Sequence, residues 1–180
     1  MLMSAKNSCL LIVDVQQGLL KAMDSPRSVL SGCSVLMKAA GVLKVPVVVT
    51  EQYPEGLGPT VETLAELAAE DAFFSKVHFS SAQNKGIRGK IETIKPSQIV
   101  IGGVEAHVCV LQSALGFMEQ GYQCCVVADA TSSRSAANHA AAMTRLRSAG
   151  VEIVTSEMVV FEWLEKAGTD DFRALSRLLK

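Results

Sequence analysis

The chain has 180 residues, of which 49% are hydrophobic and 19% are charged, and its formal net charge is −1. This composition is typical of a globular protein, and the length predicts a single domain over residues 1–180. The balanced charge and the lack of a basic run argue against a nucleic-acid partner, and no apolar run approaches the roughly 20 residues of a membrane span.

The cysteine pattern does not predict a secreted, disulfide-bonded protein. The chain has five cysteines and no CxxC motif, whereas secreted frameworks have even numbers of cysteines. The N-terminal stretch MLMSAKNS lacks the apolar core of a secretory leader. We therefore expect a reducing, cytoplasmic location, with the adjacent Cys124 and Cys125 as buried thiols rather than a strained disulfide. The high apolar content also favours a homo-oligomer, because an interface between subunits would cover part of it.

Apolar runs of strand length alternate with segments of helical period along the chain. The predicted strands are 8–14, 46–50, 72–77, 98–103, 122–129 and 151–155. The predicted helices are 28–44, 61–69, 84–95, 106–120, 135–149, 157–166 and 170–179. Because the strand runs are continuously apolar, helices should cover both faces of the sheet. The pattern predicts an α/β fold, a three-layer α/β/α sandwich with a six-stranded, mainly parallel, Rossmann-like sheet. The proline- and glycine-rich segment 50–60 is expected to be an irregular loop.

Three chemically useful side chains fall at the predicted carboxyl ends of strands or just beyond them, where open α/β sheets bind ligands. Asp14 follows the run CLLIV, Lys76 lies in FFSKV, and Cys109 comes six residues after Gly103, in the first turn of the next predicted helix. A partly buried Lys76 ammonium needs an anionic partner, and Asp14 is the natural candidate. At Cys109, free amides and the positive end of the helix dipole should favour the thiolate.

Together these residues predict a reactive thiol. Asp14 would take the proton of Cys109, Lys76 would hold Asp14 ionised and in place, and amides at the helix start would bind an oxyanion of the substrate. Taken singly, each residue type also has a common structural explanation. Asp129, which also ends a predicted strand, is expected to be structural. The segment IGGVEA lacks both GxGxxG spacing and a P-loop lysine, so no nucleotide cofactor is predicted.

The chain resembles the isochorismatase-like hydrolase superfamily. The segments that support the resemblance are LLIVDVQQGLL (10–20), VVVTEQYPEGLGPTV (47–61), FFSKVHFS (73–80) and 99–135. They cover nearly the whole length and are closest to the isochorismatase-domain-containing proteins, with nicotinamidases more distant. The resemblance implies a triad of Asp14, Lys76 and Cys109.

The resemblance further implies a non-proline cis peptide between Val104 and Glu105, and an oxyanion hole made by the amides of Cys109 and of Ala106 or a neighbour. Nicotinamidases bind a metal through an aspartate and two histidines after the second strand, but segment 50–60 contains no histidine. Neither a metal site nor another cofactor is therefore predicted.

Three residues are candidates for substrate binding. Gln16 belongs to the motif after the first strand, and His78 lies two residues from Lys76, where it either lines the pocket or has a structural role. Tyr53 either forms a pocket wall or is an exposed loop aromatic. Glu105 and His107 replace the small polar residues of many relatives, so the substrate preference of those relatives cannot be transferred.

The sequence thus predicts a metal-independent cysteine hydrolase of a small molecule. The expected reaction cleaves an amide- or imide-type carbon–nitrogen bond through a thioester at Cys109. Two alternatives stay open: hydrolysis of a vinyl ether, as in the namesake of the family, and a catalytically silent protein that keeps the fold for binding or interaction.

Overall fold

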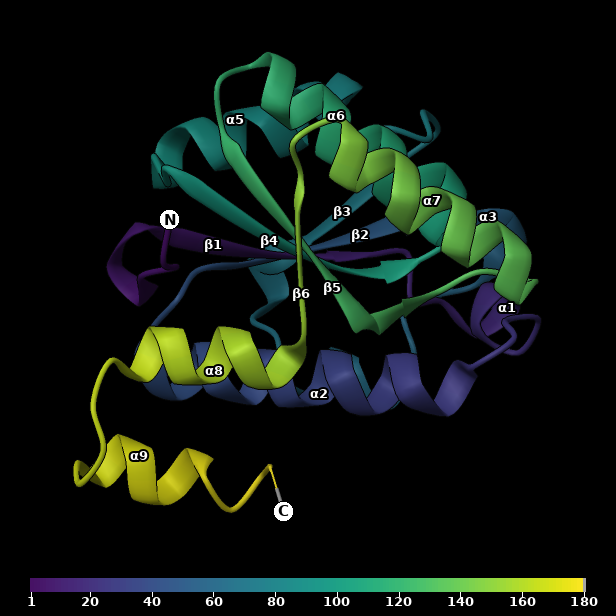
Figure 1. Cartoon of the computed structure of the whole chain (residues 1–180). Coiled ribbons are helices and arrows are strands. Elements are labelled where there is room, and N and C mark those ends of the chain that lie inside the picture. Colours follow the sequence, from purple (N-terminus) through teal and green to yellow (C-terminus); the bar gives the residue numbers. More distant parts are fainter. Residues whose placement is uncertain (180) are drawn as a thin grey trace.

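The computed structural model describes residues 1–179, which form a parallel sheet between two layers of helices (Figure 1). The strands are β1 (Ser8–Val13), β2 (Val47–Gln52), β3 (Phe73–Lys76), β4 (Gln98–Val104), β5 (Gln123–Ser132) and β6 (Glu152–Val154). All neighbouring strands are parallel, in the order β3-β2-β1-β4-β5-β6. This confirms the predicted three-layer sandwich and its six-stranded sheet.

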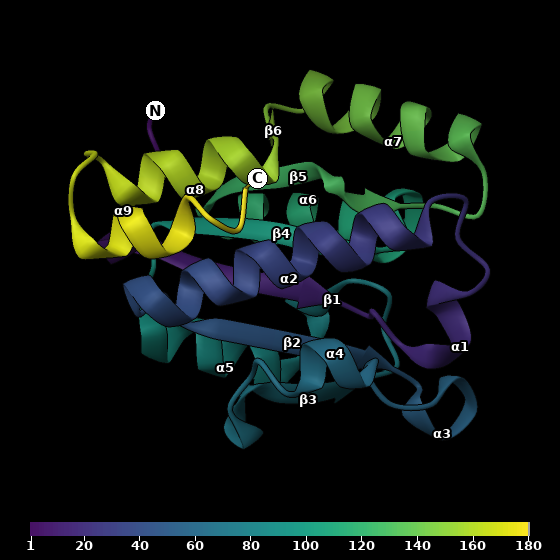
Figure 2. The same cartoon turned by 90° about the horizontal axis from the view of Figure 1, so that it is seen from below.

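The helices divide between the two faces of the sheet. They are α1 (Gln17–Leu20), α2 (Pro26–Leu43), α3 (Pro54–Leu57), α4 (Glu62–Ala65), α5 (Lys85–Ile94), α6 (Leu111–Glu119), α7 (Ala136–Ser148), α8 (Ser156–Leu164) and α9 (Asp170–Leu175). Helices α5, α6 and α7 cover one face, while α2 and α8 cover the other, with α9 packed against α8 (Figures 1 and 2). The short helices α1 and α3 contact each other near the carboxyl ends of the central strands (Figure 1). The remaining short elements are the 3-10 turns η1 (Ala5–Asn7), η2 (Glu70–Ala72) and η3 (Ser81–Gln83) and the π-helical turn η4 (Ala106–Val110).

The continuously apolar strands supply both halves of the core. In β1 all residues are buried, and successive side chains alternate between the two faces. Leu10 and Ile12 join the cluster under α2 and α8, whereas Leu11 and Val13 join the cluster under α5, α6 and α7. Each large aliphatic side chain buried in this way stabilises the fold by about 1.5–3 kcal/mol. All five cysteines, Cys124 and Cys125 included, are free and buried.

The structure corrects several predicted boundaries. The segment 50–60 is not wholly irregular, because Glu51 and Gln52 continue β2 alongside β3 and Pro54 begins the single turn α3. Strand β5 runs on to Ser132, since a register shift lets its last residues pair with the end of β4. The predicted helices 61–69 and 170–179 are longer than α4 and α9, and the predicted helix 106–120 is divided into η4 and α6.

The order of the strands creates a switch point between β1 and β4. From β1 the chain builds β2 and β3 on one side, and then β4, β5 and β6 on the other. At such a point the connections leave in opposite directions, which opens a crevice beyond the carboxyl ends of the strands. Asp14 directly follows β1, and Cys109 lies in the η4 turn after β4. Within residues 1–179, none of the helices has the length and apolar character needed to cross a membrane.

Candidate active site

Asp14 and Lys76 form a buried ion pair at the carboxyl end of the sheet. The Lys76 Nζ lies 2.7 Å from Asp14 Oδ2, and both side chains are 0% exposed. Asp14 has a left-handed backbone with φ 52°, which aspartate tolerates better than most residues. Its amide donates to the Thr50 carbonyl and its own carbonyl accepts from Gln16, so the turn after β1 is fixed by hydrogen bonds on both sides. The pairing expected between these two residues is therefore present.

Strand β2 supplies the remaining partners of this ion pair. The Thr50 hydroxyl donates to Asp14 Oδ1 at 2.6 Å, and Lys76 Nζ donates to Gln52 Oε1 at 2.7 Å. The sheet register explains these contacts, because Thr50 is level with Val13 and Gln52 with Lys76. Lys76 thus reaches past the end of β2 to Asp14. Charge-assisted bonds of this kind satisfy two ions that would otherwise be very costly to bury.

The turn that holds Cys109 follows the end of β4, where Gly103 lies against Val13 of β1. Gly103 has φ +116°, and a Cβ atom there would lie 2.1 Å from the carbonyl oxygen of Val13, so only glycine fits. The peptide bond between Val104 and Glu105 is cis. The π-helical turn η4 follows, in which the amides of Val108 and Val110 both donate to the Glu105 carbonyl. The Cys109 amide lies between these two, at the start of the helical segment that continues as α6.

The surroundings of Cys109 correct the expectation of a thiolate favoured by the helix start. Burial, together with the charge and a hydrogen bond of the nearby Asp14 carboxylate, raises the pKa of the Cys109 thiol to about 12. The Lys76 ammonium acts in the opposite direction, but more weakly than burial and Asp14. Cys109 therefore rests as a neutral thiol beside a carboxylate. Loss of solvent and a neighbouring anion outweigh the helix field.

A second ion pair borders the site. Arg134 binds the Glu105 carboxylate through Nε, which lies 3.2 and 3.0 Å from Oε1 and Oε2, and through one terminal nitrogen at 2.6 Å from Oε1, while its backbone amide donates to Oε2. The Glu105 side chain is 6% exposed and that of Arg134 is 65% exposed. The Arg134 guanidinium holds the pKa of the Glu105 carboxyl below its usual value. The pair also ties the turn after β5 to the start of η4.

A cavity of about 290 Å³ opens onto Cys109. Its walls are mainly apolar and come from α1, α3, η4 and the segment after β3, with polar groups from Gln52, Glu105 and Arg134. The volume lies at the small end of the roughly 300–1,000 Å³ that ligand pockets occupy. The arrangement presents a buried thiol, a carboxylate that can accept its proton and an apolar chamber for a small molecule.

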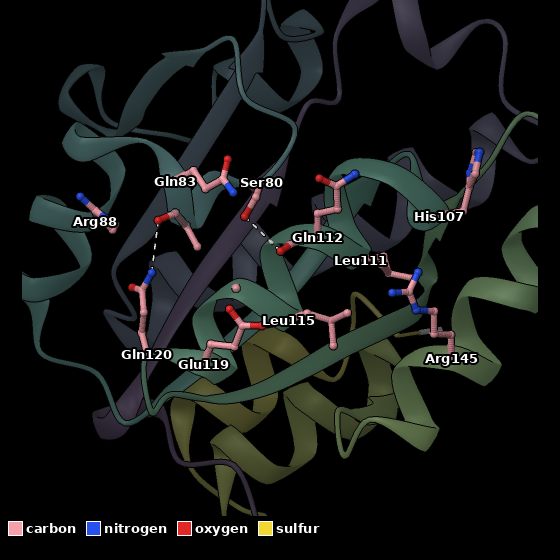
Figure 3. A pocket seen from close by; sticks show the side chains of 12 residues that line it. Ser80, Gln83, Arg88, His107, Leu111, Gln112, Leu115, Glu119, Gln120 and Arg145 are labelled. Atoms are coloured by element: carbon pink, nitrogen blue, oxygen red, sulfur yellow. Dashed lines mark hydrogen bonds between the residues drawn. The ribbon is translucent and has the colours of Figure 1, made fainter.

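A larger hollow, of about 500 Å³, lies elsewhere on the molecule. Figure 3 shows Leu115 and Glu119 of α6 between Arg88 of α5 and Arg145 of α7. The turn η4 contributes to both hollows, with His107 lining the larger one and Val108 and Cys109 lining the smaller one. We place the candidate site in the smaller cavity, because it alone of these two contains the thiol and adjoins the buried ion pair.

The candidate substrate-binding residues have different surroundings. Gln16 is fully buried, and its side chain bonds to backbone groups of Gln52 and Gly58, so it fixes the loop after β2. Tyr53 is 56% exposed, and its ring lies against Gly56 rather than lining the cavity. His78 is exposed and likewise lies outside the cavity lining. The structure thus brings Gln16 next to the site through Gln52, but does not bring the side chains of Tyr53 and His78 into it.

The structure also adds residues that sequence reasoning missed. Thr50 and Gln52 were detectable as polar residues with strand spacing at the end of an apolar run. Arg134 gave no such signal, because it meets Glu105 only in the folded chain. Asp129 has a structural role, since its carboxylate accepts from the amide and hydroxyl of Ser156 at the start of α8. Within residues 1–179, no group of three or more histidine, cysteine or acidic side chains has an arrangement that could hold a metal ion.

Comparison with known proteins identifies the family. The isochorismatase domain model matches residues 8–158. The chain belongs to the isochorismatase domain family. Isochorismatase domain-containing protein 2 of Danio rerio is 34% identical over 179 residues, covering 98% of this chain and 89% of the relative. The secreted isochorismatase effector Isc1 of Phytophthora sojae is also 34% identical, covering 97% and 85%. A solved structure titled MAR1 ribonuclease, from Caenorhabditis elegans, is 32% identical with a TM-score of 0.93, covering 99% and 92%. Membership of this family supports a hydrolase.

Proposed function

We propose that this protein is a metal-independent cysteine hydrolase that cleaves an amide- or imide-type carbon–nitrogen bond of a small molecule. The observation that supports this most strongly is the Cys109 thiol beside Asp14, whose carboxylate is paired with Lys76 at 2.7 Å and fully buried. The apolar cavity at the thiol supports a small substrate. The net charge of −1 gives no support to a polyanionic substrate.

The first half of the reaction forms a thioester. As the Cys109 sulfur attacks the carbonyl carbon, Asp14 takes the thiol proton and the carbonyl oxygen becomes an oxyanion. Backbone amides at the start of η4, those of Ala106 and Cys109, are the proposed oxyanion donors. The tetrahedral intermediate then expels the amine, which takes the proton from Asp14. Because the pKa of the resting thiol is raised, the thiol needs Asp14 to take its proton for the attack.

The second half returns the enzyme to its starting state. Asp14 takes a proton from a water molecule, whose oxygen attacks the thioester carbonyl. Collapse of this intermediate releases a carboxylic acid, and the proton on Asp14 returns to the Cys109 sulfur. One amide and one water thus give one acid and one amine. Lys76 keeps the Asp14 carboxylate in place through both halves, held in turn by Gln52.

The test uses acylation by an activated substrate. The full chain is mixed with para-nitrophenyl butyrate, and intact-mass measurement with peptide mapping identifies the acylated residue. We expect one butyryl group per chain on Cys109, with Asp14→Asn slowing its formation by about 10² or more, as for loss of a general base. Release of ammonia from butyramide and benzamide then measures turnover of true amides.

Cys33→Ala is the matched control, because Cys33 is a fully buried thiol that lies outside the cavity. It should keep full acylation, whereas Cys109→Ala should lose it. Equal acylation of the Cys109→Ala variant and the parent chain would reject the thioester mechanism. Acylation without any amide turnover would favour a protein that binds but does not hydrolyse amides. An RNA substrate belongs in the same panel because one similar structure is titled a ribonuclease, and we expect no cleavage of it.

A further inference from the structure

The walls of the Cys109 cavity offer carbon surface to a ligand. Leu19, Leu57, Phe79 and Val108 provide these walls. Phe79 is 53% exposed in the free protein, so a ligand that covers its ring would remove apolar surface from water. Burial of such surface is favourable by roughly 25 cal/mol per Å². A compact apolar group next to the scissile carbonyl would therefore gain affinity from this chamber.

The charged groups at the cavity already have partners. Asp14 is paired with Lys76, and both Glu105 oxygens are bound by Arg134. Arg134 offers Nε and a terminal nitrogen to Glu105, which is the paired arrangement that a ligand carboxylate would otherwise occupy. An incoming carboxylate would also be repelled by the charge of the buried Glu105. These contacts make the cavity unfavourable to anions, although the Arg134 cation forms part of its lining.

We infer, building on the hydrolase proposed above, that the substrate is an uncharged carbonyl compound with a compact apolar group, and that the Glu105–Arg134 pair determines this specificity by excluding carboxylates. Glu105 occupies the guanidinium and supplies the opposing charge. Arg134 in turn holds the Glu105 carboxylate at the cavity through its side-chain hydrogen bonds.

The test compares two reagents that differ mainly in charge. Iodoacetamide and iodoacetate alkylate the same sulfur with the same leaving group, and effects of thiol ionisation cancel in the ratio of their rates. Peptide mapping follows the Cys109 adduct, and glutathione gives the reference ratio. We expect the preference of Cys109 for iodoacetamide to exceed that of glutathione at least tenfold. A preference equal to that of glutathione, or a preference for iodoacetate, would overturn the inference.

Two variants should change this ratio in opposite directions. Glu105→Gln removes the anion and frees Arg134, so the preference for iodoacetamide should fall about tenfold. Arg134→Gln leaves the Glu105 charge unpaired, so the preference should rise. A purely structural role for the pair would move both ratios together or not at all, and that result would contradict the inference. Asp71→Asn is the matched control, because it breaks the exposed Asp71–Lys90 pair, which is 2.7 Å long and lies outside the cavity.

The apolar part of the inference has its own measurement. N-butyl iodoacetamide should alkylate Cys109 faster than iodoacetamide does, and Phe79→Ala should reduce that gain; an unchanged gain would contradict a role for the apolar wall. These experiments need only the thiol and not turnover. If the chain shows the predicted ratios but forms no acyl-enzyme, the specificity of the cavity is supported and the hydrolase proposal is rejected. If it forms the acyl-enzyme but shows no charge preference, the hydrolase proposal is supported and the specificity inference is rejected.

Discussion

Replacing Lys76 by methionine should strongly destabilise the protein. The ammonium makes two hydrogen bonds of 2.7 Å, to Asp14 and to Gln52, and its side chain is 0% exposed. Hydrogen bonds to charged groups contribute about 1.5–3 kcal/mol each, and breaking a buried ion pair from one side costs about 3–5 kcal/mol. Both estimates give a loss of several kcal/mol in the free energy of unfolding for Lys76→Met, or roughly 6–20 °C in Tm for a chain of this size.

A double variant, Lys76→Met with Asp14→Asn, separates the contribution of the ion pair to stability from the contribution of side-chain packing. Asp14→Asn removes the charge that Lys76→Met leaves unpaired, so the two substitutions together should cost less than the sum of their separate costs. Urea unfolding followed by circular dichroism measures all four proteins of the cycle. A Lys76→Met variant within about 1 kcal/mol of the parent, or strictly additive effects, would refute a buried and paired ammonium.

Two further predictions concern the β1/β4 junction and the buried thiols. Gly103→Ala should destabilise the protein by several kcal/mol or prevent folding, because the added Cβ would lie 2.1 Å from the Val13 carbonyl oxygen at φ +116°. Gly121 has a similar φ of +92° but open space around it, so Gly121→Ala measures the cost of the backbone strain alone. Equal losses of stability in the two variants would contradict the predicted clash. Burial raises the pKa of Cys33 from 9.0 to about 12, so this thiol stabilises the fold at and below pH 9 and loses that effect as the pH rises toward 12. Stability should therefore fall above pH 9, and Cys33→Ala should reduce the slope by about 1.4 kcal/mol per pH unit in pH-dependent urea unfolding; an unchanged slope would contradict the raised pKa.

The fold was predictable because its strands are apolar on both faces. A run such as CLLIV has no solvent side, so its sequence alone indicates a covered parallel sheet. In parallel strands the carboxyl ends share one edge, and this placed Asp14 and Lys76 together before their contact was known. The prediction of an irregular loop over 50–60 was wrong in part, because the composition of this segment gave no sign of its pairing with β3. Proline and glycine in segment 50–60 suggested a loop, yet Glu51 and Gln52 extend β2 because β3 pairs with them.

The details of the site depended on tertiary surroundings. The thiolate expected at Cys109 followed from a local argument about the helix start, but burial and the Asp14 charge come from segments far away in sequence. Arg134 is 29 residues from Glu105, and no spacing rule links them. Tyr53 was a reasonable candidate for the cavity from its place after β2. Its left-handed backbone and its contact with Gly56 turn the ring elsewhere.

The residues of the candidate site come from two parts of the chain that pair through β1 and β4. Asp14 and Lys76 both precede residue 77, and Cys109 lies beyond residue 98. Strand β1 runs beside β4, with Val13 level with Gly103. The proposed proton acceptor, Asp14, and its counter-ion Lys76 thus take their side-chain hydrogen bonds from Thr50 and Gln52 of the same part of the chain. A substitution such as Gly103→Ala that forces β1 and β4 apart would therefore disturb the position of the Cys109 sulfur relative to Asp14 together with the packing of the sheet.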